Sequence, residues 1–164
     1  MCFSATASFA ASGVLTLAGV ATLSQVKEKK QIPFAAIPLL FGVQQFFEGF
    51  VWLALQDQEY ARFESVSTIV FLIFAQVIWP VLVPLSILFI ERDKKRKILL
   101  RMFSVVGLIV GSFLGYRILQ YDVKAEISDL HINYILNFPS FNLNYKGILY
   151  FVATVLPAPR WAPQ

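Results

Sequence analysis

Residues 32–55 read IPFAAIPLLFGVQQFFEGFVWLAL and contain one charged side chain, Glu48. At about 1.5 Å per residue, a helix of this length crosses a hydrocarbon core about 30 Å thick. An ionised carboxylate in lipid is costly, so such residues face the interior of a helix bundle or water. The stretch therefore predicts a membrane-spanning helix with a buried acid near its middle.

The whole composition is typical of the same class of protein. Hydrophobic residues make up 57% of the 164 residues and charged residues 15%, whereas soluble domains are about a quarter charged. Apolar stretches predict spans at residues 5–26, 32–55, 66–90 and 98–120. Residues 145–157 are too short to cross a bilayer and predict a partial fifth span. We therefore expect an all-α, polytopic transmembrane helical bundle that forms one membrane domain over residues 1–164.

Prolines predict where the spans are interrupted. Pro33 suits a helix start, because its missing N–H falls where no partner within the helix exists. Pro38 lies further in and predicts a kink. Pro80 and Pro84 each remove a backbone hydrogen bond from the third span, so we expect a bent or locally opened helix there.

The basic residues predict the orientation. They gather in KEKK, residues 27–30, and in ERDKKRK, residues 91–97, whereas the opposite loops contain Arg62 and Lys124. The positive-inside rule then places both clusters in the cytoplasm and the N-terminus outside. This distribution argues against a nucleic-acid partner despite the net charge of +4, and the sequence has no zinc-finger spacing and no glycine-rich phosphate loop. The expected partner is the lipid bilayer.

Glu48 lies in the strongest candidate site. Spacings of four residues place Gln44, Glu48 and Trp52 on one helix face, with Gln45 beside them. One interpretation is a carboxylate that binds a proton or a cation, with the glutamine amides as hydrogen-bond partners. The other is a neutral glutamic acid that joins two helices as a structural hydrogen-bonding residue.

Further polar residues lie in or near the predicted spans. Gln76 and Trp79 fall in the proline-rich third span, where a loosened helix could line a cavity. Arg117, near the outer end of the fourth span, either extends to the outer headgroups or pairs with Glu48 or an anionic substrate.

Small residues mark two further helix faces. Ser4 and Ser8 begin a hydroxyl series along the first span, which either packs closely against a neighbour or supplies partners for the buried acid. Gly107, Gly111 and Gly115 form a double G-x-x-x-G pattern in the fourth span. This pattern predicts close helix packing, either within the chain or between protomers of a homo-oligomer.

Catalytic and metal-binding patterns are missing from the sequence. The chain has one cysteine, Cys2, and one histidine, His131, and neither G-x-S-x-G nor H-E-x-x-H occurs. We therefore expect no metal, no cofactor and no catalytic residue of a familiar type. An intramembrane enzyme with Glu48 as base and Cys2 or a serine nearby stays open as an alternative.

Residues 121–144 predict an amphipathic segment on the outer surface. Its apolar residues are spaced by four, three, four and four positions, which favours a helix; they are Val123, Ile127, Leu130, Tyr134 and Phe138. Charged and amide side chains occupy the positions between them. We expect this helix to lie on the bundle or cap it.

MCFSATASF, residues 1–9, and PFAAIPLLFGVQQFFEGFVW, residues 33–52, resemble a family of uncharacterised bacterial integral membrane proteins. Members of that family open with Met-Cys-Phe-Ser-Ala-Thr-Ala-Ser and carry IPLLFG-x-Q-Q-x-x-EG-x-x-W in their second span. The resemblance is close over the first two spans and extends to the next two only in hydropathy. It implies a protein of the bacterial inner membrane and implies no activity. The shared positions include Cys2, Ser4, Gln44, Gln45, Glu48, Gly49 and Trp52.

These observations lead to one preferred function and several alternatives. We expect a small transport or proton- or cation-coupled membrane protein that uses the intramembrane carboxylate of Glu48. The alternatives are a structural or oligomerising membrane protein, an intramembrane lipid-binding protein and an intramembrane enzyme.

Overall fold

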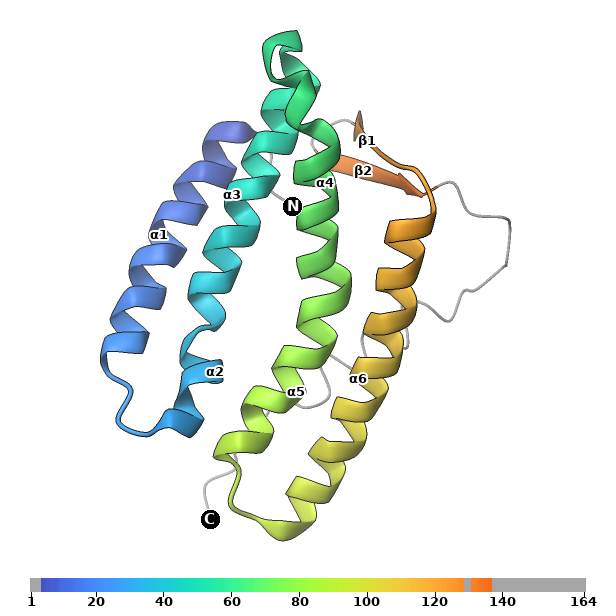
Figure 1. Ribbon diagram of the computed structural model, residues 1–164. Helices are drawn as coiled ribbons and strands as arrows, with labels where there is room; N and C mark the ends of the chain where they lie inside the picture. The colour runs from blue at the N-terminus through green and yellow to red at the C-terminus, as the bar shows by residue number, and fades with distance from the viewer. Residues whose placement is uncertain (1–3, 129–130, 137–164) are drawn as a thin grey trace.

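The computed structural model describes residues 4–128 and 131–136. These residues form a bundle of long helices with a β-hairpin at one end (Figure 1). The helices are α1 (Ala5–Ser24), α2 (Ile32–Ala35), α3 (Ile37–Gln56), α4 (Glu64–Ile73), α5 (Trp79–Ile90) and α6 (Lys94–Gln120). Shorter turns are η1 (Lys29–Gln31), η2 (Gln58–Phe63) and the π-helix η3 (Phe74–Ile78), and the strands are β1 (Val123–Ser128) and β2 (His131–Leu136).

Four helical stretches within the described residues are long and apolar enough to cross a membrane, which fits a membrane protein. They are Ala5–Ser24, Lys29–Gln56, Gln58–Ile90 and Lys94–Gln120. The prediction of a mostly helical fold with four helices long and apolar enough to span a membrane is therefore confirmed. The predicted partial span at 145–157 lies outside the described residues.

Prolines interrupt the second and third spans where the sequence predicts it. Pro33 lies in the first turn of α2 and Pro38 in the first turn of α3, with the break at Ala36 between them. In the third span, η3 directly precedes Pro80. Proline lacks an N–H, and its ring clashes with the carbonyl of the residue four positions earlier, which is Gln76 within η3. The wider π-helical turn is a local response to that missing hydrogen bond.

The helices α1 and α3 are antiparallel and pack in close contact. A β-carbon placed at Gly19 would lie 2.5 Å from the Leu39 backbone nitrogen, and one at Gly49 would lie 2.7 Å from the Phe9 ring. Ser12 Oγ donates a hydrogen bond of 2.8 Å to the Gly42 carbonyl oxygen. Small residues at these positions let the two backbones approach closely.

The glycine face of α6 packs inside the chain. A β-carbon at Gly107 would overlap the Pro80 carbonyl group, and one at Gly111 would lie 3.0 Å from the Val77 carbonyl oxygen. A β-carbon at Gly115 would lie 3.2 Å from a Val77 methyl group. This face therefore contacts η3 and α5, and it is already occupied within one protomer.

The segment after α6 is a β-hairpin, so the prediction of an amphipathic helix over 121–144 is wrong for its described part. The strands β1 and β2 are antiparallel, with Ala125 opposite Tyr134 and Ile127 opposite Ile132. Alternation places Ala125 on the buried side of β1 and Ile132 on that of β2. The apolar residues of this segment fit both a helical spacing and the alternation of a strand. The segment forms strands because the alternating residues pack on α3.

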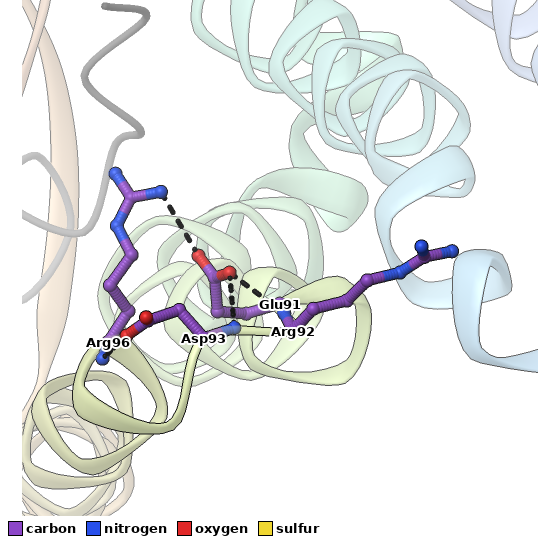
Figure 2. A network of polar contacts seen from close by, with 4 residues as sticks. All are labelled: Glu91, Arg92, Asp93 and Arg96. Atoms are coloured by element: carbon purple, nitrogen blue, oxygen red, sulfur yellow. Dashed lines mark hydrogen bonds and ion pairs between the residues drawn. The ribbon is translucent and has the colours of Figure 1, made fainter. Parts of the chain in front are cut away.

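Both basic loops lie at the end of the bundle opposite the hairpin (Figure 1). A hydrogen bond from Lys30 lowers the pKa of Glu28, and the charges of Lys30 and of Arg92 in the second loop add to this effect. Figure 2 shows the second loop, where Glu91 Oε1 accepts hydrogen bonds from the backbone N–H groups of Arg92 and Asp93. The Asp93 carboxylate accepts from the backbone N–H of Arg96 at 2.8 Å and caps α6. This cap explains why α6 begins at Lys94, earlier than the predicted residue 98.

Candidate functional site

Glu48 is buried inside the bundle on α3. Its side chain is 1% exposed, and its carboxyl Oε2 accepts a hydrogen bond of 2.8 Å from Gln45 Nε2. The two residues are three positions apart, so one helical turn brings the carboxamide to the carboxyl group. The arrangement partly compensates the cost of placing a polar acid in an apolar interior.

Gln44 joins α3 to the third span. Trp79 Nε1 donates a buried hydrogen bond of 2.6 Å to Gln44 Oε1. The Trp79 ring also stacks on Phe41, with the ring centroids 4.0 Å apart and the planes 19° from parallel. Trp79 is the first residue of α5, directly after the π-helix, so the opened part of the third span is fixed to the helix that carries Glu48.

Trp52 lies one turn after Glu48 and forms the contact between α3 and the hairpin. It is 2% exposed and packs in a cluster with Val51, Ala125 and Ile132. Its indole Nε1 is buried and has no hydrogen-bond partner among the described residues. The hairpin therefore covers the end of α3 next to the acid and leaves a buried donor beneath it.

Tyr134 of β2 reaches the same region, and sequence reasoning did not assign it to the site. Its ring stacks on Phe71 of α4 at a centroid distance of 5.1 Å and packs against the Trp52 cluster. Burial raises the pKa of the Tyr134 phenol above its ordinary value of 10.0, and the charge of Glu48 raises it further. The phenol therefore lies within reach of the charge of Glu48. The available signal was the alternation in HINYIL, residues 131–136, which places Ile132 and Tyr134 on one face.

The secondary candidates fall in different places. Gln76 is half-buried within η3. Arg117 is only 8% exposed and its guanidinium lies 5.5 Å from the Phe113 ring centroid, so the interpretation that it extends to the headgroups is wrong. Ser4 Oγ caps α1 by accepting a hydrogen bond of 3.2 Å from the Ala7 N–H, whereas Ser8 is fully buried. Cys2 lies outside the described residues.

The polar groups around Glu48 are suited to exchanging a proton or holding a small polar ligand. Among the residues that the structure describes, no group of three or more His, Cys, Asp and Glu side chains is placed to hold a metal ion. One carboxyl group, one carboxamide and a nearby phenol can exchange a proton or hold a small polar ligand.

The fold and this site define a small helical membrane-type protein with a buried carboxyl group. The chain belongs to DUF6629, a family of unknown function whose model matches residues 1–158. No curated protein and no solved structure matches the chain. The expectation of an uncharacterised family is thereby confirmed, and the comparisons assign no activity to it.

Proposed function

We propose that the protein is a small proton-coupled transport protein of the membrane, with Glu48 as the residue that binds and releases the proton. The observation that carries this proposal is the nearly complete burial of the Glu48 carboxyl group at a site with polar neighbours. Acids inside membrane spans are rare because they are costly, and those that persist mark proton and ion pathways.

The neighbours of Glu48 suit both protonation states. The Gln45 amide donates a hydrogen bond to Oε2, which stabilises the ionised carboxylate, and a protonated carboxyl group can still accept that hydrogen bond at its carbonyl oxygen. The nearby third span contains a π-helical turn, a feature found frequently at functional sites. The Gln44–Trp79 hydrogen bond couples that turn to α3, so a change at Glu48 can be transmitted between the two spans.

The proposal includes an orientation. With the loops at 27–30 and 91–97 in the cytoplasm, the N-terminus and the hairpin lie outside. Glu48 then lies in the outer half of its span, beneath the hairpin. We assign the protein to the inner membrane of a bacterium on the basis of its N-terminal sequence.

A structural role for Glu48 is the second candidate, because the same burial also suits a hydrogen-bonded acid that never ionises. In that case Gln45, on the same helix, offsets the cost of burying the carboxyl group, and the lipid-facing surface supplies any contact between protomers. The two candidates differ in one measurable property, which is whether the carboxyl group titrates.

The test is an infrared difference titration of the purified protein in lipid, with the Glu48→Gln variant used to identify the carboxyl band. Proton-coupled transport predicts a Glu48 carboxyl band whose intensity changes with pH, together with a proton flux into vesicles that Glu48→Gln abolishes. The matched control is Glu64→Gln, which alters an acid in the first turn of α4 and should leave the flux unchanged. A Glu48 carboxyl that stays protonated at every pH, with no flux, would refute transport and support the structural role.

A further inference from the structure

Four buried hydrogen-bond donors lack a partner among the residues that the structure describes. They are Ser8 Oγ, Trp52 Nε1, Thr68 Oγ1 and Tyr134 Oη, contributed by α1, α3, α4 and β2. Ser8 is 0% and Thr68 1% exposed. A buried donor without an acceptor carries the full desolvation penalty of its polar group, and native proteins rarely leave several in one region.

Each of the four donors lies in the Trp52 cluster beneath the hairpin or about one helical turn from a residue that contacts this cluster, and we refer to this region as a layer. Trp52 and Tyr134 share the cluster on the end of α3, and Ala5, one turn before Ser8 on α1, packs against that cluster. Phe71, which stacks on Tyr134, lies one turn after Thr68 on α4. Glu48 lies one turn before Trp52, on the same face of α3.

A cavity lies at the hairpin end of the bundle, between α4, the end of α6 and the start of β1. Its volume is about 220 Å³, and it is lined by Ser65, Ile69 and residues 118–123, which connect α6 to β1. Ser65 lies one turn before Thr68 on α4, so the cavity and the buried hydroxyl are adjacent along one helix. A volume of this size exceeds that of several water molecules, each of which takes about 30 Å³ in the liquid.

We propose that Ser8, Trp52, Thr68 and Tyr134 bind a small cluster of water molecules that connects the Glu48 carboxyl group to the hairpin end of the bundle. The waters accept hydrogen bonds from the four donors and donate to the Glu48 carboxyl group, so they can relay one proton at a time between bulk water at the hairpin end and the carboxylate. This inference rests on the proposed function. It adds that Glu48 exchanges its proton with the hairpin end of the bundle.

The charged and titratable groups around this layer come from the hairpin and from the end of α6. Tyr134 faces the layer from the hairpin, Arg117 is buried at the same end of α6, and the exposed residues Tyr121 and Asp122 line the cavity. The helix α1 contains no titratable residue, and α4 contains only Glu64, in its first turn. Glu48 is therefore the acid that the water cluster serves, and the donors act as positioning residues for the water.

Hydrogen–deuterium exchange of the Glu48 carboxyl group tests the proposal. The full-length protein in lipid is transferred from H₂O to D₂O, and the shift of the Glu48 infrared band is followed in time. The variants Ser8→Ala, Thr68→Val and Tyr134→Phe each remove one donor with little change in shape. The matched control is Ser86→Ala, because Ser86 is also a fully buried serine but donates to the Val83 carbonyl oxygen of its own helix at 2.8 Å.

Each donor variant should slow the exchange at least about tenfold, and Ser86→Ala should leave it within about twofold of the original protein. If one variant loses its helical circular dichroism, the other two decide the result. Equal exchange rates in all folded variants would overturn the water cluster, as would a Glu48 band that does not exchange over hours. If protons flow but the donor variants exchange as fast as the original protein, the transport proposal stands and the water cluster is rejected. If the donor variants slow the exchange but no proton flux is found, the water cluster stands and the transport proposal is rejected.

Discussion

Replacing Gly107 with alanine should destabilise the bundle more than the same change at the other glycines of α6. The added β-carbon would overlap the Pro80 carbonyl oxygen and lie 2.7 Å from its carbonyl carbon, whereas ordinary contact begins at 3.4 Å. The shortfall at the carbon is 3.4 − 2.7 = 0.7 Å, and it lies between two backbones with no side chain that can rotate away. α5 and α6 must therefore separate.

The size of the effect follows from two opposing terms. Overpacking of this kind costs about 1–3 kcal/mol, and a backbone contact belongs at the upper end of that range. Alanine in place of glycine regains roughly 1 kcal/mol of helix propensity. The net expectation is a loss of about 2 kcal/mol, or about 30-fold in the ratio of folded to unfolded protein.

The assay is a denaturant titration of the protein in detergent micelles, followed by helical circular dichroism. Gly13→Ala is the control, because a β-carbon at that helical position meets nothing within 4 Å and should stabilise by roughly 0.5–1 kcal/mol. Gly115→Ala faces only a Val77 methyl group and should be close to neutral, with Gly111→Ala between it and Gly107→Ala. Equal stability of Gly107→Ala and Gly13→Ala would refute the packing argument.

Two further predictions concern the Gln44–Trp79 hydrogen bond inside the bundle and the hydrogen bonds of Glu91 in the loop before α6. Gln44→Leu or Trp79→Phe alone should destabilise by about 1–3 kcal/mol, because each leaves a buried polar partner unpaired. A double-mutant cycle in the same titration should give a coupling of at least about 0.5 kcal/mol, and a coupling of zero would contradict a Gln44–Trp79 bond. Hydrogen bonds from the loop backbone, first that of Asp93, lower the pKa of Glu91 below 4.5 in the folded protein. The ionised carboxylate therefore stabilises the loop above pH 4.5. This stabilisation is lost as the pH falls through the pKa of the folded state. The carboxyl carbon shift of Glu91 measured by NMR should therefore have its midpoint below pH 4.5, and a midpoint at or above 4.5 would show that these hydrogen bonds do not form.

Most of the helical architecture could be predicted because it depends on local properties. The length of an apolar run decides whether it can cross a bilayer, and the composition of residues 32–55 already contains that information. The breaks near Pro38 and Pro80 follow from the missing N–H of proline, which needs no partner elsewhere in the chain.

A helix was predicted where the hairpin lies, because a helical and an alternating pattern of apolar residues overlap in this segment. Val123 and Ile127 fit a helical spacing, whereas Ala125, Ile132 and Tyr134 fit an alternating one. A short segment outside the spans has too little apolar surface to choose between them by itself. Packing on Trp52 makes the choice, because only the strands bury Ala125 and Ile132 there.

The sequence by itself determined that helices form, where they break, and that an acid with glutamine neighbours lies inside one of them. Only the tertiary structure decided that Gln44 binds Trp79, 35 positions away, that Gly107 faces Pro80, and that Tyr134 packs against the Trp52 cluster. The physical reason is that propensity and hydropathy are sums over neighbouring residues. Contacts between helices depend instead on which faces meet when the whole chain is packed.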